Sequence, residues 1–556
     1  MLTGIIAIAL FPKISGDTAT LSGAVFDHSK VAMVDEMIRS GLPPGNPFFG
    51  EAGHETPLVY YYLWHYSAAE LALVFGVTGW EADIAMTAVT AFSSLSLMIG
   101  LAVWISGRPL AGVLVTVLAF AGSLYPVLEF TLTRDRFYSY FLPSTGFSGW
   151  LFQSTWAPQH VASASSVVVA CYLLIWLARR PSVLLVAVLA LVTTAGYQSS
   201  TWVGGITFAL AAPIIGVVLL ASCAPAQRRS FAFSAIASGL LAVALAFPFL
   251  HDQFAAIASR GIAGPIALDV HDTFNKLSIA EPWRSVLDIP GYWLAFLPIE
   301  FPAIYFAGLW SLAGGLRSTK KADRQVVQVF AALAFVSLMV AGYTTITFSH
   351  NNDLGWRAVL PGVFVLTIFS AALLSRLPTR PLGWPVTAAI VLVLLGLPRS
   401  FQILTENVGG TPSPSARTFA ATPAMWAAVR RHSDANERIA NNPLFMSAMT
   451  PWPINISWAL LGNRRSCFAG PEFAPFTSLP RETVAVIDRQ FARIFQEGSS
   501  ADIPDLAHRY QCTVAVLTAE DGAWQKDPFA DSGLYKLADE SPGRWKIYRL
   551  IAAPRL

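Results

Sequence analysis

Long apolar runs recur through the first 399 residues, and they restrict the folds that this chain can adopt. A helix needs about 17–25 predominantly apolar residues to cross the hydrocarbon core of a bilayer. The pattern predicts an all-α polytopic membrane protein with about eleven transmembrane helices, the first being the short run Leu2–Phe11. The other runs cover Ile84–Ser106, Leu110–Leu128, Val161–Leu177, Val183–Gly196, Trp202–Ala221, Phe231–Leu250, Gly291–Leu316, Val326–Phe348, Leu354–Leu374 and Trp384–Leu397.

Composition agrees with this class and excludes others. Only 13% of the 556 residues are charged, whereas soluble globular proteins carry about 25%. Disorder is excluded because 54% hydrophobic and 12% aromatic residues would not stay solvated. A net charge of +3 gives no support for a nucleic-acid partner. The four cysteines lack the spacing of a metal site.

Charged residues concentrate after residue 399, where 31 of the 71 charges fall within residues 400–556. We therefore expect a transmembrane domain at 1–399 and a soluble α/β domain at 400–556. Cys467 and Cys512 could pair in the second domain or remain buried thiols. The pattern there predicts helices over Pro423–His432 and Glu482–Gln496 and strands over Thr513–Thr518 and Arg544–Ile551.

Basic residues in the short loops indicate the orientation of the chain. Five alternate short loops carry eleven basic residues and one acid, Asp323, so this face is expected to be cytoplasmic. We therefore expect a protein of the inner (plasma) membrane, with its N-terminus in the cytoplasm and its C-terminal domain in the periplasm. The loops at 12–83, 129–160 and 251–290 also lie outside, and loops of this length are often functional.

The first outer loop contains Asp27 and His28, just beyond the first apolar run. An acid in this position could act as a general base on a hydroxyl, or it could cap the helix predicted over Phe26–Arg39. Asp35 and Glu36 in that helix are expected to face solvent. A second helix, over Pro57–Val74, is rich in aromatic residues and is typical of the membrane–water boundary.

The other candidate residues are polar groups at or near the outer ends of apolar runs. Asp135 lies between two arginines and could simply pair with them. Gln159 and His160 end a stretch of aromatic and polar residues that suits a sugar, a phosphate or an interfacial belt. Arg357 matches a phosphate in its fork geometry, with Asp353 as an alternative partner within the loop. Glu300 is a costly charge inside an apolar run, which marks a candidate functional site.

Together these features resemble the GT-C superfamily of integral membrane glycosyltransferases. The resemblance covers nearly the whole chain: many spans, an acid soon after the first span, and a C-terminal outer domain. It implies a polyprenyl-phosphate or polyprenyl-diphosphate sugar as donor and a cell-envelope glycan, lipid or protein as acceptor. The stretches 156–160 and 352–357 do not match the well-described members, and a WWDYG-type motif is absent, so protein N-glycosylation is not expected.

The resemblance also assigns roles to residues of this chain. Asp27 would be the general base, with Asp135 orienting the acceptor, and the two acids could also hold Mg²⁺ or Mn²⁺. Attack in line would invert the anomeric carbon. The residues expected to bind the substrate or the carrier phosphate are Arg357, His160, Gln159, His28, Glu300 and Asp353.

Two other function classes stay open at this stage. A transporter or flippase for a lipid-linked or small solute would also need many spans, but such proteins usually show inverted repeats and helices broken near mid-membrane. No repeat is visible, and the polar groups gather in outer loops. A non-catalytic assembly protein that keeps the fold is the third alternative, and it predicts that Asp27 is dispensable.

Overall fold

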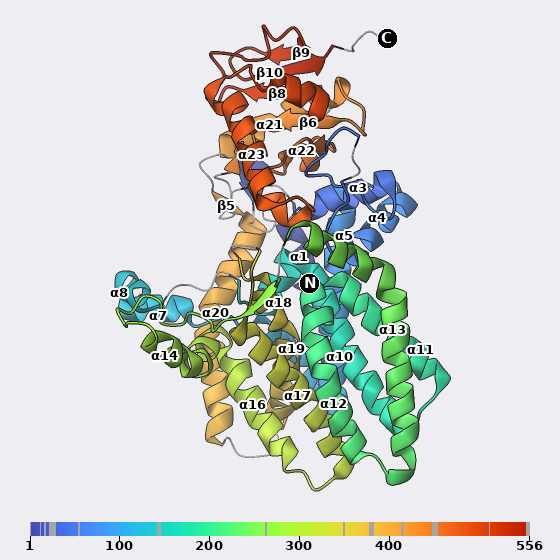
Figure 1. Ribbon diagram of the computed structural model, residues 1–556. Coiled ribbons are helices and arrows are strands. Elements are labelled where there is room, and N and C mark those ends of the chain that lie inside the picture. The colour runs from blue at the N-terminus through green and yellow to red at the C-terminus, as the bar shows by residue number, and fades with distance from the viewer. Residues whose placement is uncertain are drawn as a thin grey trace. The chain divides into compact units, whose positions relative to one another are not determined.

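The chain forms two compact units in the computed structural model (Figure 1). The helical unit comprises Met1–Ile6, Thr87–Leu250 and Gly264–Thr405, and the mixed unit comprises Ala7–Met86, His251–Ala263 and Glu406–Leu556. Each unit is therefore assembled from separate stretches of sequence. The structure describes residues 2–11, 13–15, 18–21, 29–53, 56–141, 146–261, 264–348, 351–376, 383–412, 416–447, 454–510 and 512–551.

The described residues contain seven helices that are long and apolar enough to cross a membrane, or nine if each of two bent pairs counts as one span. The chain is a multi-pass membrane protein, but the expected eleven spans are not confirmed. Two of the expected spans correspond to helices that are too short to be counted: α1 (Leu2–Ala9) has eight residues and α11 (Val183–Ser199) has 17. The seven are α5 (Gly79–Ser106), α10 (Pro158–Arg179), η1 with α12 (Thr201–Thr207 and Phe208–Ser222), α13 (Pro225–Ser259), α17 (Lys321–Tyr343), α18 with α19 (Asp353–Ala358 and Leu360–Leu374) and α20 (Trp384–Gly409).

Two further spans are broken. The first bends by 50° between α6 (Leu110–Phe120) and α7 (Tyr125–Leu132). The second bends by 116° where α15 (Leu297–Glu300) gives way to α16 (Pro302–Leu316). A proline stands in the first turn of α7 and of α16, where its missing N–H costs nothing. The two breaks meet, because the Leu124 N–H donates to the Ile299 carbonyl at 2.9 Å.

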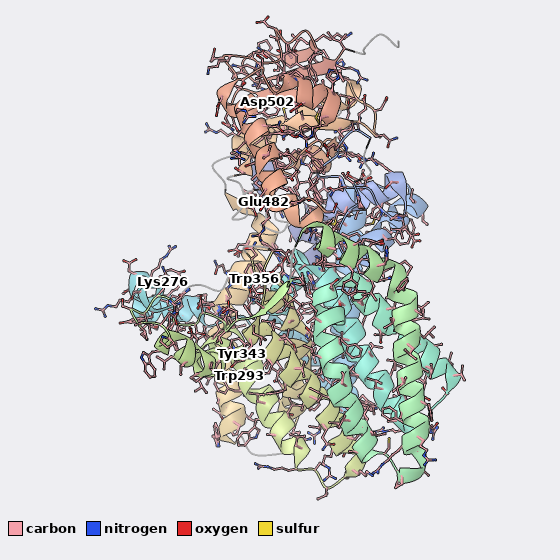
Figure 2. The ribbon with its side chains drawn as sticks, in the orientation of Figure 1. Lys276, Trp293, Tyr343, Trp356, Glu482 and Asp502 are labelled. Atoms are coloured by element: carbon pink, nitrogen blue, oxygen red, sulfur yellow. A yellow bond between two sulfur atoms is a disulfide. The ribbon has the colours of Figure 1, made fainter. Side chains whose placement is uncertain are left out.

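The core of the helical unit is organised around α19, which is almost wholly buried against α6, α10, α16 and α17. The second bent span begins with α14 (Trp283–Gly291) and the π-helical η2 (Tyr292–Phe296). The Trp293 indole N–H donates to the Tyr343 hydroxyl at 2.7 Å and so connects this span to α17 (Figure 2). A short antiparallel pair, β3 (Ile266–Leu268) with β4 (Thr344–Ile346), connects the segments before α14 and after α17.

The mixed unit contains a five-stranded sheet in the order β7-β6-β8-β10-β9. β6 pairs in parallel with β7 and β8, whereas β10 is antiparallel to β8 and β9. Helix α21 (Ala416–Arg431) covers one face of the sheet and α23 (Arg481–Ala492) covers the other. This confirms the predicted α/β class of the C-terminal part. The strands are β6 (Arg438–Asn441), β7 (Arg465–Ser466), β8 (Cys512–Thr518), β9 (Tyr535–Ser541) and β10 (Trp545–Leu550).

Part of the first outer loop also belongs to the mixed unit. It supplies α3 (Lys30–Ser40), α4 (Leu63–Phe75) and the strands β1 (Lys13–Ser15) and β2 (Thr18–Leu21), the latter pairing with β5 (Thr411–Pro412). Phe48 stacks on Phe473 with ring centroids 4.4 Å apart. The Ser466 N–H donates to the Pro47 carbonyl and the Ala469 N–H donates to the Phe48 carbonyl, both at 2.8 Å.

Asp35 and Glu36 do not face solvent, which corrects the sequence-based expectation. Asp35 is 4% exposed and Glu36 is fully buried. The Glu36 carboxylate accepts two hydrogen bonds from Arg465, at 2.7 and 2.6 Å. Arg465 lies 429 positions further along the chain, so no local sequence pattern could have revealed this partner.

A disulfide joins Cys467, next to β7, to Cys512, the first residue of β8, with Cα atoms 5.9 Å apart. The sequence left this pairing open. Among the described residues, Cys171 and Cys223 are free thiols buried in the helical unit. The covalent link closes a loop that contains η5 (Pro471–Phe476), α23, η6 (Arg493–Glu497) and η7 (Asp505–Arg509).

Candidate functional site

Arg357 lies in α18 with its side chain buried in the helical unit. The Asn352 side chain caps this short helix by accepting the Gly355 N–H at 3.0 Å. The Arg357 Nη1 donates to Gln153 Oε1 at 2.7 Å. Its Nε is buried and has no hydrogen-bond partner in the part of the chain that the structure describes. A guanidinium has five N–H donors, so donors remain for an anionic ligand.

The alternative partner, Asp353, contributes a weaker contact. Its Oδ1 lies 3.4 Å from Arg357 Nη2, and its side chain is 41% exposed, whereas that of Arg357 is 6% exposed. The shorter bond is to Gln153, a neutral amide on α9 (Trp150–Trp156). Gln153 is oriented by donating to the Gly146 carbonyl at 2.9 Å. Arg357 is thus held in place largely by an uncharged group.

Gln159 and His160 lie in the first turn of α10, and both are buried. His160 Nδ1 is 2.8 Å from the Ser200 hydroxyl, which also accepts the Val203 N–H at the start of η1. Gln159 Oε1 is buried and has no hydrogen-bond partner among the described residues. The π-helical η1 packs against both α10 and α18, and π-helical turns often occur at functional sites. These elements therefore gather buried polar groups, among them Arg357, Gln159 and His160, in one region of the helical unit.

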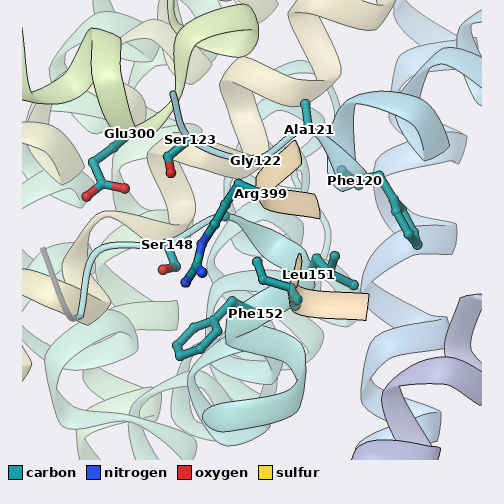
Figure 3. Close-up of a pocket in the computed structure, with 12 residues that line it drawn as sticks. Phe120, Ala121, Gly122, Ser123, Ser148, Leu151, Phe152, Glu300 and Arg399 are labelled. Atoms are coloured by element: carbon teal, nitrogen blue, oxygen red, sulfur yellow. The ribbon is translucent and has the colours of Figure 1, made fainter. Parts of the chain in front are cut away.

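Glu300 is buried at the end of α15 and lines a different pocket (Figure 3). This pocket has a cavity volume of only about 20 Å³ and is also lined by Arg399, Ser123 and Ser148. The segment around α9 borders both places: Phe152 lines the pocket, and the next residue, Gln153, holds Arg357.

Asp135 lies on an exposed face of α8 (Arg134–Tyr140), at the periphery of the helical unit (Figure 1). No described ion pair joins it to Arg134 or Arg136, and no described contact connects it with Arg357. Asp27 and His28 lie outside the described residues. Within the described part of the chain, no group of three His, Cys, Asp or Glu side chains could hold a metal ion.

Sequence reasoning missed Gln153, Ser200 and Arg399 as candidates. Gln153 stands in an aromatic stretch that resembles an interfacial belt, and Arg399 closes an apolar run like an ordinary flanking charge. Ser200 had a usable signal, because Ser199-Ser200-Thr201 is a polar run between two apolar ones, followed by Gly204-Gly205.

Comparison with known proteins gives one relative over nearly the full length. The uncharacterized protein y4nK of Sinorhizobium fredii (strain NBRC 101917 / NGR234) is 32% identical over 567 residues, which cover 98% of this chain and 83% of the relative. A family model described as the Y4nK C-terminal Rossmann-like domain matches residues 415–549.

Two solved structures resemble the whole chain. The crystal structure of ArnT from Cupriavidus metallidurans in the apo state matches with a TM-score of 0.52 and 10% identity, covering 100% of this chain and 97% of that one. The cryo-EM structure of the arabinofuranosyltransferase AftD from Mycobacteria has a TM-score of 0.52 and 13% identity, covering 99% of this chain and 39% of that one. At such identities the likeness shows the fold alone. The chain therefore belongs to the y4nK family, and its fold is that of the GT-C glycosyltransferases.

Proposed function

We propose that this protein is an inverting glycosyltransferase that moves a sugar from a polyprenyl-phosphate carrier to a hydroxyl of a cell-envelope acceptor. The observation that carries the proposal is the Arg357 guanidinium, which is buried beside a neutral amide and keeps a buried N–H without a hydrogen-bond partner among the described residues. The GT-C fold supports the same reaction class by analogy.

This reaction requires a base for the acceptor hydroxyl and a cation for the departing phosphate. The acceptor hydroxyl gives its proton to a carboxylate while its oxygen bonds to the anomeric carbon. The bond between that carbon and the phosphate oxygen breaks at the same time, and its electron pair leaves with the carrier phosphate. Arg357 would stabilise the departing phosphate, as a positioned charge does at any developing anion.

The remaining roles follow from position. Asp27 would be the base, His28 would contact the substrate beside it, and Asp135 would orient the acceptor or help to hold Mg²⁺ or Mn²⁺. Gln159 and His160 would bind the sugar or phosphate, because they lie buried in the region that η1 joins to α18. Asp353 would limit the net charge at Arg357. The metal requirement is left open in this proposal.

One observation favours the transport alternative: two spans are broken, as in many transporters. These breaks fall at Ala121–Leu124 and at Phe301, about 20 Å from the helix ends that carry Arg108 and Arg317 at 1.5 Å per residue. On this count they lie about 5 Å beyond the midplane of a ~30 Å core, a depth that is compatible with either function. We retain the glycosyltransferase as the better-supported function.

The test is release of free polyprenyl phosphate from lipid-linked sugars by the purified full-length protein, with a membrane extract as the source of acceptor. Arg357→Gln is expected to lower the rate by about 100-fold or more, the usual loss when one electrostatic contact to the transition state is removed. Arg324→Gln is the matched control, because Arg324 is exposed near the start of α17.

Asp27→Asn tests the base in the same assay. Loss of release with retained folding would support Asp27, and release equal to the wild type would move the role to Asp135. Absence of release by the wild type across several sugar-lipid pools would favour the transporter.

A further inference from the structure

The segment Trp283–Glu300, made of α14, η2 and α15, runs across the helix that follows it. We call this segment the ledge. Its axis is bent by 116° from that of α16, which is about 26° more than a right angle. Its 18 residues extend about 27 Å at 1.5 Å per residue. In keeping with this bend, α14 stands out at the side of the helical unit (Figure 1).

The outward face of the ledge is apolar. Its large apolar side chains are exposed to between 43% and 77% and comprise Trp283, Val286, Leu287, Ile289 and Leu294. Three of them, at positions 283, 286 and 287, have the i, i+3, i+4 spacing of one helix face. Soluble proteins rarely expose a contiguous apolar surface to water, so such a face indicates a partner.

The polar groups of α14 are paired or buried. Arg284 Nη2 lies 2.5 Å from a carboxylate oxygen of Glu281, and the Ser285 hydroxyl donates to the same carboxylate at 2.8 Å. Asp288 is 1% exposed and accepts two backbone N–H groups of the preceding loop, at 3.0 and 2.8 Å. The helix therefore keeps its polar groups satisfied by the protein while it presents apolar side chains outward, as a helix in contact with lipid does.

The depth of the ledge follows from α16, the helix after the break. Phe301 lies about 20 Å from the end of α16 that precedes Arg317, at 1.5 Å per residue. This is beyond the midplane of a hydrocarbon core about 30 Å thick. Because α16 exposes Phe306 and Trp310, apolar side chains face outward on both sides of the break. Transmembrane helices tilt by about 20° on average, and such a tilt of α16 is enough to bring the ledge close to the membrane plane.

We infer that the ledge lies nearly parallel to the membrane plane in the leaflet opposite Arg317, with its apolar face against the acyl chains of the lipids. The apolar spacing, the paired or buried polar groups and the depth of the break support this placement. A helix that lies in the plane buries its apolar face below the headgroups, and tryptophan, here Trp283, is enriched at the membrane–water interface. The inference does not depend on the proposed glycosyl transfer, because its test needs no turnover.

The test measures the depth of spin labels on the purified full-length protein in nanodiscs of phosphatidylethanolamine and phosphatidylglycerol. A nitroxide is attached to Trp283→Cys or to Leu294→Cys. Its collisions with oxygen, which dissolves in lipid, are compared with its collisions with a nickel chelate, which dissolves in water. Phe306→Cys on α16 is the control for a lipid-facing position. Lys276→Cys, at an exposed position in the loop before the ledge, is the control for water (Figure 2).

Both labels on the ledge should collide more with oxygen than with the nickel chelate, as at Phe306→Cys, and Lys276→Cys should show the reverse. The two labelled positions are 11 residues apart. Their depths should differ by about 7 Å or less for a helix within 26° of the plane, against about 16 Å for a helix that crosses the bilayer. Cys171 and Cys223 are buried, and the wild-type protein taken through the same labelling gives the background.

Three results would overturn the inference. Access of the nickel chelate equal to that at Lys276→Cys would place the apolar face in water. Low access of both reagents would show that protein covers the face, and dipolar broadening between labels would identify that protein as a second copy of the chain. A depth difference of about 16 Å would make the ledge a crossing helix. If Trp283→Cys does not fold, Val286→Cys takes its place, eight residues from Leu294, with expected differences of about 5 Å and about 12 Å.

Discussion

Asp35 is a buried acid in the mixed unit, and the pKa of its carboxyl is unusually high. Burial raises the pKa of its carboxyl from 3.8 to about 7. The Arg39 charge and the Gly79 N–H oppose this rise in pKa, and the neighbouring Glu36 adds to it. The side chain is therefore partly protonated at neutral pH. Between about pH 4 and pH 7 the folded protein holds a proton that the unfolded chain has already lost.

This proton makes the stability depend on pH in a defined direction. The free energy of unfolding contributed by Asp35 is largest below about pH 4 and falls as the pH rises to about 7, by about 4 kcal/mol at most. Asp35→Asn should remove this dependence and unfold at a higher temperature than the wild type at pH 8. The measurement is the thermal midpoint of both proteins from pH 5 to pH 8.

Glu482→Gln is the control for Asp35, because Glu482 is exposed on α23. Its thermal midpoint should change with pH in the same way as that of the wild type. If the thermal midpoint of Asp35→Asn also followed the wild type, the Asp35 carboxyl would have an ordinary pKa in the folded state.

At the residue scale, sequence reasoning singles out a polar residue that stands against an apolar background. Arg357 and Glu300 were identified in this way, and both are buried beside polar groups. It failed for Glu36, because an acid in an amphipathic helix resembles a solvated residue until its distant arginine is known. It missed Arg399 because a charge at the end of a span has an ordinary explanation.

The π-helical turn η1 is the element that joins the candidate site together. Gly204 lies against the backbone of α11, where an added Cβ would be 2.1 Å from the Gly196 carbonyl carbon. This close approach sets the position of Ser200, which contacts His160. A side chain at residue 204 would have to push α11 and η1 apart.

Gly204→Ala should therefore destabilise the protein by about 1–3 kcal/mol, as overpacking a core usually does. It should also lower polyprenyl-phosphate release through the loss of the Ser200–His160 contact. Gly216→Ala, in α12 of the same span, is the matched control, since no atom lies within 4 Å of the added Cβ. Its stability should be unchanged or raised by about 1 kcal/mol. Equal behaviour of the two variants would remove the argument for close packing at η1.

At the element scale, long apolar helices were predictable from the sequence and their breaks were not. The run Trp202–Ala221 corresponds to η1 with α12. The 116° bend at Phe301 falls inside the run Gly291–Leu316, which was expected to be one span. Apolar composition is the same on both sides of such a bend, so hydropathy cannot locate it.

At the scale of the whole molecule, the disulfide offers a test of orientation. Disulfides persist in oxidising compartments, so Cys467 and Cys512 should be oxidised if their unit lies outside the cytoplasm. Alkylation of the denatured protein without reductant should modify two thiols, Cys171 and Cys223, and four after reduction. Mass spectrometry of the intact protein counts the labels.

The variant Cys467→Ser/Cys512→Ser is the control, and it should take two labels under both conditions. Four labels on the wild-type protein before reduction would contradict the predicted orientation, in which the basic loops are cytoplasmic.

The class of the whole molecule was predictable from the distribution of charge and apolar runs: a polytopic helical part and a C-terminal α/β part. The way in which the parts are assembled was not. The first outer loop was expected to be a membrane-domain loop, yet it shares a core with the C-terminal sheet. That partnership depends on Glu36 with Arg465 and Phe48 with Phe473, pairs that no single stretch of sequence contains.

This shared core sets an order of events during synthesis. Glu36 leaves the ribosome 429 residues before Arg465, and at about 5–20 residues per second the interval is about 20–90 s. During that time α3 has none of its C-terminal partners, and its buried acid is without its arginine. A chain that stops near residue 400 would keep the membrane helices and still leave the beginning of the protein unfinished. In nascent copies of this protein the first loop therefore waits for its packing partners until the last domain has been made.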